Sequence, residues 1–166
     1  MKKILALTVF IVLVFCISGI DNTLADEAKN EAIIERNMEE IWNNQNYAVA
    51  DEIVAPNYVR HLPGGKEVKG REGYKEFVKS FMKSSPDTRG IMERVASEGD
   101  YVVVYYLVSG THTGSGGSLG PPTGKKWNWE AIVIHRLAGG EMRECWQIGD
   151  DLGFMTQLGY KLVPPE

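Results

Sequence analysis

The chain has 166 residues, of which 43% are hydrophobic and 24% are charged, and its formal net charge is −4 at pH 7. This length fits one domain with a short appendage, and the composition is that of an ordinary globular protein. The sequence contains no basic patch, which argues against a nucleic-acid partner.

The first 25 residues have the pattern of a secretory signal peptide. Lys2 and Lys3 precede an uncharged, mainly apolar run from Ile4 to Ile20, and Thr23-Leu24-Ala25 offers small residues at the two positions that a signal peptidase reads. We therefore expect residues 1–25 to be cleaved and residues 26–166 to form an exported domain. An uncleaved membrane anchor is the alternative, although the run is at the short end for a spanning helix of about 20 residues.

Three helices are expected in the first half of this domain. Apolar residues recur at the helical interval within residues 26–44 and within residues 70–83. A shorter helix is expected over residues 47–54. Residues 58–62 are predicted to be extended, and Pro63-Gly64-Gly65 is predicted to turn the chain.

From residue 88 onward the pattern changes to the alternation that is typical of strands. Strands are predicted over residues 88–97, 101–113, 126–137 and 141–149, followed by a short closing helix. Helices followed by a four-stranded antiparallel meander predict an α+β fold. Because the long strands carry apolar residues in both phases, one face should be covered by the helices and the other by a second subunit.

Eight short segments are each weak signals alone, but their order along the chain is characteristic of a protein family. They are Glu40-Ile-Trp-Asn-Asn44, Ala55-Pro-Asn-Tyr-Val-Arg-His61, Gly70-Arg-Glu-Gly-Tyr-Lys-Glu-Phe77, Glu98-Gly-Asp-Tyr-Val-Val-Val104, Gly110-Thr-His-Thr-Gly114, Pro121-Pro-Thr-Gly-Lys-Lys126, Glu144-Cys-Trp-Gln-Ile-Gly-Asp-Asp-Leu-Gly153 and Gln157-Leu-Gly159. Together the chain resembles the SnoaL-like polyketide cyclases, also called ester cyclases, of the nuclear transport factor two-like superfamily.

The resemblance implies a cone-shaped, curved antiparallel sheet wrapped around N-terminal helices, with a pocket at one end and dimers through the outer face. It also implies an aspartate that acts as general acid and base in an intramolecular aldol ring closure, without a metal or organic cofactor. That aspartate matches Asp150. Gly149 precedes it here, where relatives often carry a larger residue, and Arg60 and His61 stand where relatives often carry two histidines.

Asp150 therefore has two interpretations. It is a catalytic acid and base if an apolar pocket raises its pKa, or it caps the closing helix. Trp146 shares a strand face with Asp150 and is predicted to form the wall or floor of the pocket. His61 is predicted to shuttle a proton or stabilise charge beside Asp150, with a structural role as the alternative.

Further ligand contacts are predicted for Tyr58, Tyr105 and His112, which could face the same opening. His135 is interpreted as structural. The three histidines lack the spacing of metal ligands, so no metal is expected.

The sequence thus predicts an exported protein that binds a small hydrophobic molecule containing a carbonyl group. It would catalyse a cyclisation or isomerisation through Asp150 without a cofactor. The alternative is a non-catalytic binding or dimerisation module of the cell envelope.

Overall fold

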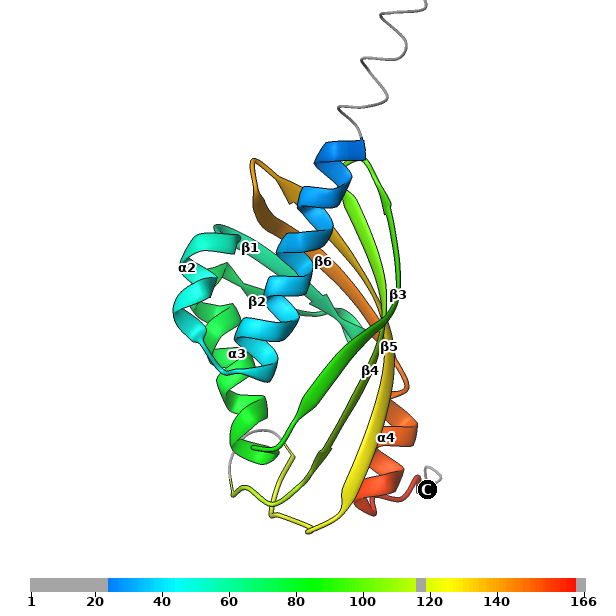
Figure 1. Cartoon of the computed structure of the whole chain (residues 1–166). Helices are drawn as coiled ribbons and strands as arrows, with labels where there is room; N and C mark the ends of the chain where they lie inside the picture. Colours follow the sequence, from blue (N-terminus) through cyan, green and yellow to red (C-terminus); the bar gives the residue numbers. More distant parts are fainter. Residues whose placement is uncertain (1–23, 116–118, 164–166) are drawn as a thin grey trace, which may run out of the picture.

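The structure, a computed structural model, describes residues 24–115 and 119–163. Six strands in these residues form one open, curved sheet (Figure 1). They are β1 (Val54–Leu62), β2 (Lys66–Lys69), β3 (Arg89–Glu98), β4 (Tyr101–Thr111), β5 (Lys126–Ala138) and β6 (Glu141–Gly149). Their order is β2-β1-β6-β5-β4-β3, which confirms the predicted α+β fold with its curved sheet.

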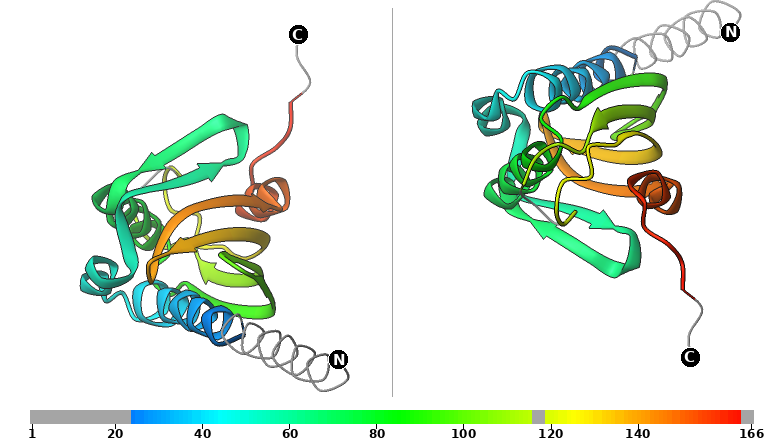
Figure 2. Two further views of the ribbon diagram at one scale, coloured as in Figure 1. Left: turned by 90° about the horizontal axis from the view of Figure 1, so that it is seen from above. Right: turned by 90° about the horizontal axis from the view of Figure 1, so that it is seen from below.

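Most of the helical segments lie on the concave side of this sheet (Figure 2). Residues 24–36 are α-helical and continue as a π-helix, η1 (Asn37–Asn43). The other helical segments are η2 (Tyr47–Val49), α2 (Ala50–Ile53), η3 (Pro63–Gly65), α3 (Gly70–Ser84) and α4 (Asp151–Leu158). Helix α4 packs on β5 and is the closing helix that the sequence predicted.

The sheet is larger than the predicted four-stranded meander. The segment predicted to be extended over residues 58–62 is a nine-residue strand that already begins at Val54, so the preceding helix ends at Ile53. Strand β1 pairs with β6 in parallel, whereas all other neighbours are antiparallel. Parallel neighbours are far apart in the sequence, so the local pattern could not predict this pairing.

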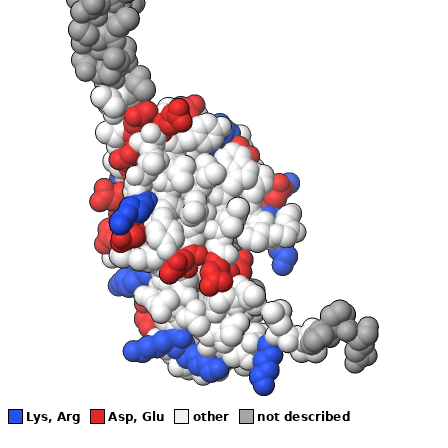
Figure 3. Space-filling model, turned by 90° about the vertical axis from the view of Figure 1, so that its right-hand side faces the viewer, with Lys and Arg blue, Asp and Glu red and all other residues white. Residues whose placement is uncertain are grey.

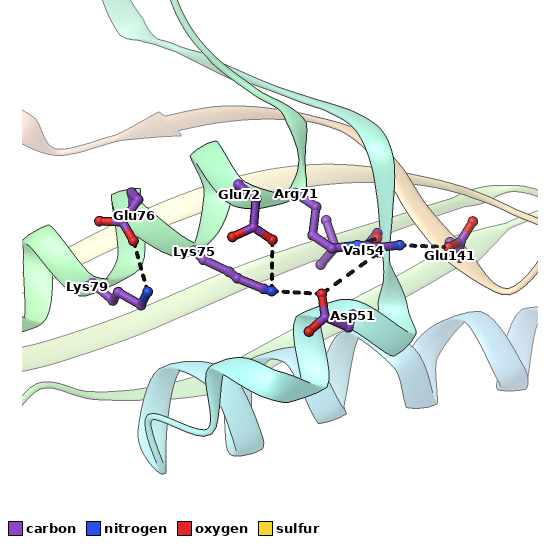
Figure 4. A network of polar contacts seen from close by, with 8 residues as sticks. All are labelled: Asp51, Val54, Arg71, Glu72, Lys75, Glu76, Lys79 and Glu141. Atoms are coloured by element: carbon purple, nitrogen blue, oxygen red, sulfur yellow. Dashed lines mark hydrogen bonds and ion pairs between the residues drawn. The ribbon is translucent and has the colours of Figure 1, made fainter.

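Helix α3 is fixed to α2 and β1 by polar contacts (Figure 4). Lys75 Nζ lies 2.7 Å from Asp51 Oδ1, and the Nε of Arg71 donates to the carbonyl oxygen of Val54 at 2.5 Å. Exposed ion pairs contribute little free energy each. They nevertheless hold the helix whose inner face carries buried Tyr74 and other apolar side chains at the helical interval.

The long strands alternate between the interior and the outer face. In β4, Val102, Val104 and Tyr106 are buried in the hydrophobic core, whereas Tyr101 and Val103 are exposed. This is the alternation expected of a sheet with helices on one face. Figure 3 shows the outer face, on which uncharged residues cover much of the surface over the strands.

Residues 1–23 of the predicted signal peptide lie outside the described residues. Ala25, after which cleavage is expected, lies near the start of the first described helix. No helix in the described part of the chain is long and apolar enough to cross a membrane.

Candidate functional site

A cavity of about 130 Å³ lies between the helices and the concave face of the sheet. Its wall is mainly apolar, and α3 contributes Phe77 and Phe81 while β5 contributes Val133. An engineered apolar cavity of about 150 Å³ holds benzene. This cavity therefore has room for a molecule of about one ring.

The π-helix η1 supplies three lining residues, Asn37, Met38 and Trp42. π-Helical segments are rare in proteins, and those that do occur are often found at functional sites. The Nε1 of Trp42 donates to the hydroxyl of Tyr74 at 2.9 Å, and that hydroxyl donates to Asn37 Oδ1. These hydrogen bonds fix the indole and the amide that face the cavity.

Strand β1 places a positive charge at the cavity. Because side chains alternate along the strand, Tyr58 and Arg60 are buried while His61 points to the opposite face. Arg60 is only 7% exposed, its Nη2 donates to Gln147 Oε1, and its Cζ lies 5.1 Å from the centre of the Phe77 ring. An arginine in this position is always protonated. The apolar cavity therefore has one charged wall.

A buried pair, Tyr106 of β4 and His135 of β5, lines the same cavity. The hydroxyl of Tyr106 lies 3.1 Å from Nε2 of His135, whereas Nδ1 has no partner among the described residues. Burial, with the charge of Arg60 as a second cause, lowers the pKa of His135 to about 3. Burial also raises the pKa of Tyr106. Both groups are therefore neutral near pH 7 and act as hydrogen-bond donors and acceptors.

Trp129, Gly149 and Asp151 meet at the rim of the cavity. Asp151 is exposed, and its Oδ1 accepts a hydrogen bond of 2.9 Å from Nε1 of Trp129. A Cβ atom at position 149 would lie 2.3 Å from Cζ2 of Trp129. With the indole in this position, only glycine fits beneath it.

Asp150 is the N-cap of α4. It is exposed, its Oδ1 accepts a hydrogen bond of 2.8 Å from the backbone N–H of Gly153, and it does not line the cavity. This is the capping arrangement that the sequence left open as the alternative. The carboxylate that the structure brings to the cavity belongs to the next residue, Asp151.

Because Asp150 caps α4, two substitutions at this position should have different effects on the free energy of unfolding. Asn caps helices as well as Asp, so Asp150→Asn should leave the free energy of unfolding within about 0.5 kcal/mol of the wild type. Asp150→Ala should lower it by about 1 kcal/mol. Urea unfolding followed by tryptophan fluorescence measures both values. Equal stability of the alanine variant and the wild type would contradict the capping role.

His61 and Trp146 lie together on the face of the sheet that is opposite to the cavity. Their rings stack, with centres 5.4 Å apart and planes 12° apart. His61 Nδ1 lies 3.2 Å from Glu67 Oε1, and Nε2 lies 2.9 Å from Glu144 Oε1. The hydrogen bond from His61 is the main cause that lowers the pKa of Glu144. The cavity contacts predicted for His61 and Trp146 are therefore absent, because both side chains have the outward phase of their strands.

The three other predicted ligand contacts also lie outside the cavity lining. Tyr58 is buried, and its hydroxyl donates to Cys145 Sγ at 2.9 Å. His112 is buried beyond the end of β4. The hydroxyl of Tyr105 donates to Glu130 Oε2 at 2.5 Å on the outer face. Within residues 24–115 and 119–163, no three His, Cys, Asp or Glu side chains gather closely enough to hold a metal ion.

Strand alternation in the sequence could have identified Arg60 and Gln147, two polar cavity residues that were not among the predicted site residues. Tyr58 was predicted to face the pocket, and strand alternation then places Arg60, not His61, on the same side. The same rule puts Gln147 opposite in phase to Trp146. His135 was interpreted as structural, and no local pattern shows that it shares a cavity with Arg60.

Comparison with known proteins agrees with this fold. The family model described as "SnoaL-like polyketide cyclase" matches residues 32–158. No curated protein shows significant similarity to the chain.

Solved structures give three informative neighbours. A proposed SnoaL-like polyketide cyclase from Jannaschia sp. CCS1 is 26% identical, with a TM-score of 0.74 over 84% of this chain and 95% of that chain. IdmH, a proposed polyketide cyclase from Streptomyces antibioticus, is 27% identical, with a TM-score of 0.68 over 79% and 99%. A proposed polyketide cyclase from Acidithiobacillus ferrooxidans is 32% identical, with a TM-score of 0.68 over 78% and 94%.

Proposed function

Because the chain belongs to the SnoaL-like polyketide cyclase family, we propose that it binds a small, mainly apolar carbonyl compound in the cavity and catalyses an acid–base cyclisation or isomerisation. The observation that carries the proposal is the convergence of polar groups on one apolar cavity. Arg60, His135 and Gln147 line it from three strands, and Asp151 lies at its rim. An apolar pocket with a few converging polar groups is the usual form of a small-molecule site.

Each polar group has a role in such a reaction. Removing a proton next to a carbonyl needs a base, for which the carboxylate of Asp151 is available at the rim. The oxygen of the resulting enolate needs a preorganised donor, for which the side-chain amide of Gln147 is available. Arg60 and neutral His135 supply donors for a second polar group of the ligand. The hydroxyl of Tyr106 holds the His135 ring in place.

The cavity can be tested by filling it. Val108 and Val103 lie on the same strand, but Val108 lines the cavity and Val103 is exposed on the outer face. In a screen of small ketones and acids followed by tryptophan fluorescence, Val108→Phe should weaken binding by at least about tenfold, whereas Val103→Phe should not. Equal binding to both variants would mean that the ligand site lies elsewhere.

The two neighbouring aspartates can be tested with the same substitution. With a substrate in hand, Asp151→Asn should retain binding and lose turnover, while Asp150→Asn should retain both because the cap is preserved. If Asp150→Asn alone loses turnover, the base is the residue indicated by the family resemblance. If neither variant changes turnover, neither carboxylate is the base.

We further propose that two copies pair through the outer face of the sheet. The apolar side chains exposed on the outer face of β3 to β6 are Ile91, Tyr101, Val103, Ile132, Ile134 and Ile148. In the strand register, Val103 pairs with Ile134, and Ile132 pairs with Ile148, so the apolar surface is continuous across strands. The upper part of this face in Figure 3 is largely uncharged. A continuous apolar face with charged margins suits a symmetric contact with a second copy.

The wild type is therefore expected to sediment as a dimer and Ile132→Glu as a monomer. A carboxylate at this position would be buried without a partner in the contact. Leu162→Glu is the matched control, because Leu162 is 80% exposed after α4, beyond the strands of this face. A monomeric wild type, or a dimer that persists in Ile132→Glu, would contradict the proposal.

We also propose that the protein is exported. The support is the charged start, the apolar run and Ala25 in the sequence. N-terminal sequencing of the protein from the cell envelope or medium should begin at Asp26. A start at Met1 in the membrane fraction would favour the anchor instead.

A further inference from the structure

The positive charge of Arg60 has no negative partner among the described residues. Its guanidinium contacts the amide of Gln147 and the ring of Phe77 and lies beside the neutral hydroxyl of Tyr58, and its Nε has no hydrogen-bond partner among the described residues. The residue is 7% exposed, so water does not solvate the charge as it would at the surface. A charge that is buried without a counter-charge is among the costliest arrangements in a protein.

The chain cannot relieve this cost by removing the proton, because an arginine side chain stays protonated in proteins. The charge does, however, border the cavity of about 130 Å³. A molecule that enters this volume reaches the guanidinium without displacing a protein carboxylate. An anionic group on that molecule would supply the missing partner.

A second buried polar atom points to the same conclusion. Nδ1 of His135 has no partner among the described residues, the residue is 2% exposed, and it lines the same cavity as Arg60. The other ring nitrogen, Nε2, is held by the hydroxyl of Tyr106. A carboxylate has two oxygens and could accept from both residues.

The remaining walls define the body of the ligand. Phe77, Phe81 and Val133 are apolar, and the volume is close to that of a cavity of about 150 Å³ that holds benzene. The space therefore suits about one ring, and a fused polycyclic molecule would have to extend past the rim at Trp129 and Asp151.

We propose that the natural ligand is a compact carboxylic acid, bound as its carboxylate to Arg60 and His135 with an apolar body of about one ring. This inference rests on the proposed function, because it assumes that the cavity is the ligand site. It adds the charge and the size of the ligand, and it makes Arg60 the residue that selects acids over their neutral analogues.

Benzoate and its uncharged analogue benzamide test this directly in the full-length protein. Isothermal titration calorimetry near neutral pH should show that benzoate binds at least about tenfold more tightly than benzamide, since a buried charge-assisted pair is lost with the amide. Arg60→Met should remove this preference. Arg94→Met is the matched control, because Arg94 is exposed on β3 and should leave the preference unchanged.

The cavity-filling variant separates the two proposals. If benzoate binds equally well to Val108→Phe, the cavity is not the site, and both proposals fall. If Val108→Phe blocks binding but the wild type binds benzamide as tightly as benzoate, the cavity stands and the carboxylate assignment is wrong. The absence of binding by both compounds would also overturn the assignment. Because the comparison of benzoate with benzamide uses only the wild type, the test does not depend on how Arg60→Met folds.

Discussion

The ligand-free Arg60→Met variant is expected to be more stable than the wild type, by about 1–4 kcal/mol in the free energy of unfolding. Methionine is shorter than arginine, but it keeps an unbranched apolar stem and carries no charge that must be desolvated. The Gln147 amide that loses its partner is half-buried and can turn toward water. Urea unfolding at equal protein concentration measures the difference.

The control for this experiment is Arg94→Met, which should change the free energy of unfolding by less than about 0.5 kcal/mol because Arg94 is exposed. A clear loss of stability in Arg60→Met would mean that the guanidinium already has its counter-charge in the folded protein. A gain in stability with a loss of benzoate binding would show that the chain retains an unfavourable charge for the sake of its ligand.

Acid is expected to destabilise the protein well above the range in which carboxylates titrate. Burial lowers the pKa of His135 from 6.5 to about 3. Between these two values the unfolded chain binds a proton that the folded protein does not, so stability falls as the pH falls. The contribution of His135 from about pH 7 to about pH 5 should be a loss of about 2 kcal/mol.

The variant His135→Gln should lose less stability over the same interval, because glutamine does not titrate while its amide can still reach the hydroxyl of Tyr106. Measuring above about pH 5 reduces the contribution of the carboxylates with lowered pKa, such as those of Asp87 and Glu144. Parallel pH profiles for wild type and variant would contradict the assignment of this effect to His135.

Sequence periodicity was sufficient for the main helices and for the four strands of the antiparallel meander. The apolar stripe of α3 and the two-residue turn at Gly139 and Gly140, both with positive φ, indicate their elements without tertiary information. Strand β1 was predicted too short because its first residues, Val54 and Ala55, continue directly from the preceding helix. Its parallel pairing with β6 depends on contacts between distant segments, which local patterns do not encode.

The candidate site was less predictable because it depends on strand phase. Whether Arg60 or His61 faces the interior changes with a shift of one residue, and one reliable anchor is needed to choose. Tyr58 was such an anchor, but the prediction placed both Tyr58 and His61 at the opening, which strand alternation does not allow. The same one-residue difference separates Asp150, which caps α4, from Asp151, which reaches the cavity.

The close approach of Gly149 to Trp129 has a consequence for how wide the entrance of the cavity is. Any side chain at position 149 would push the indole aside, break its hydrogen bond to Asp151 and release that carboxylate. A larger residue at position 149 therefore requires a smaller one at position 129. Natural variation at either position should be accompanied by a compensating change at the other. If the large and the small residue exchanged positions, the width of the cavity entrance would change, and with it the range of molecules that can enter. Arg60 and His135, which line the interior of the cavity, would stay the same.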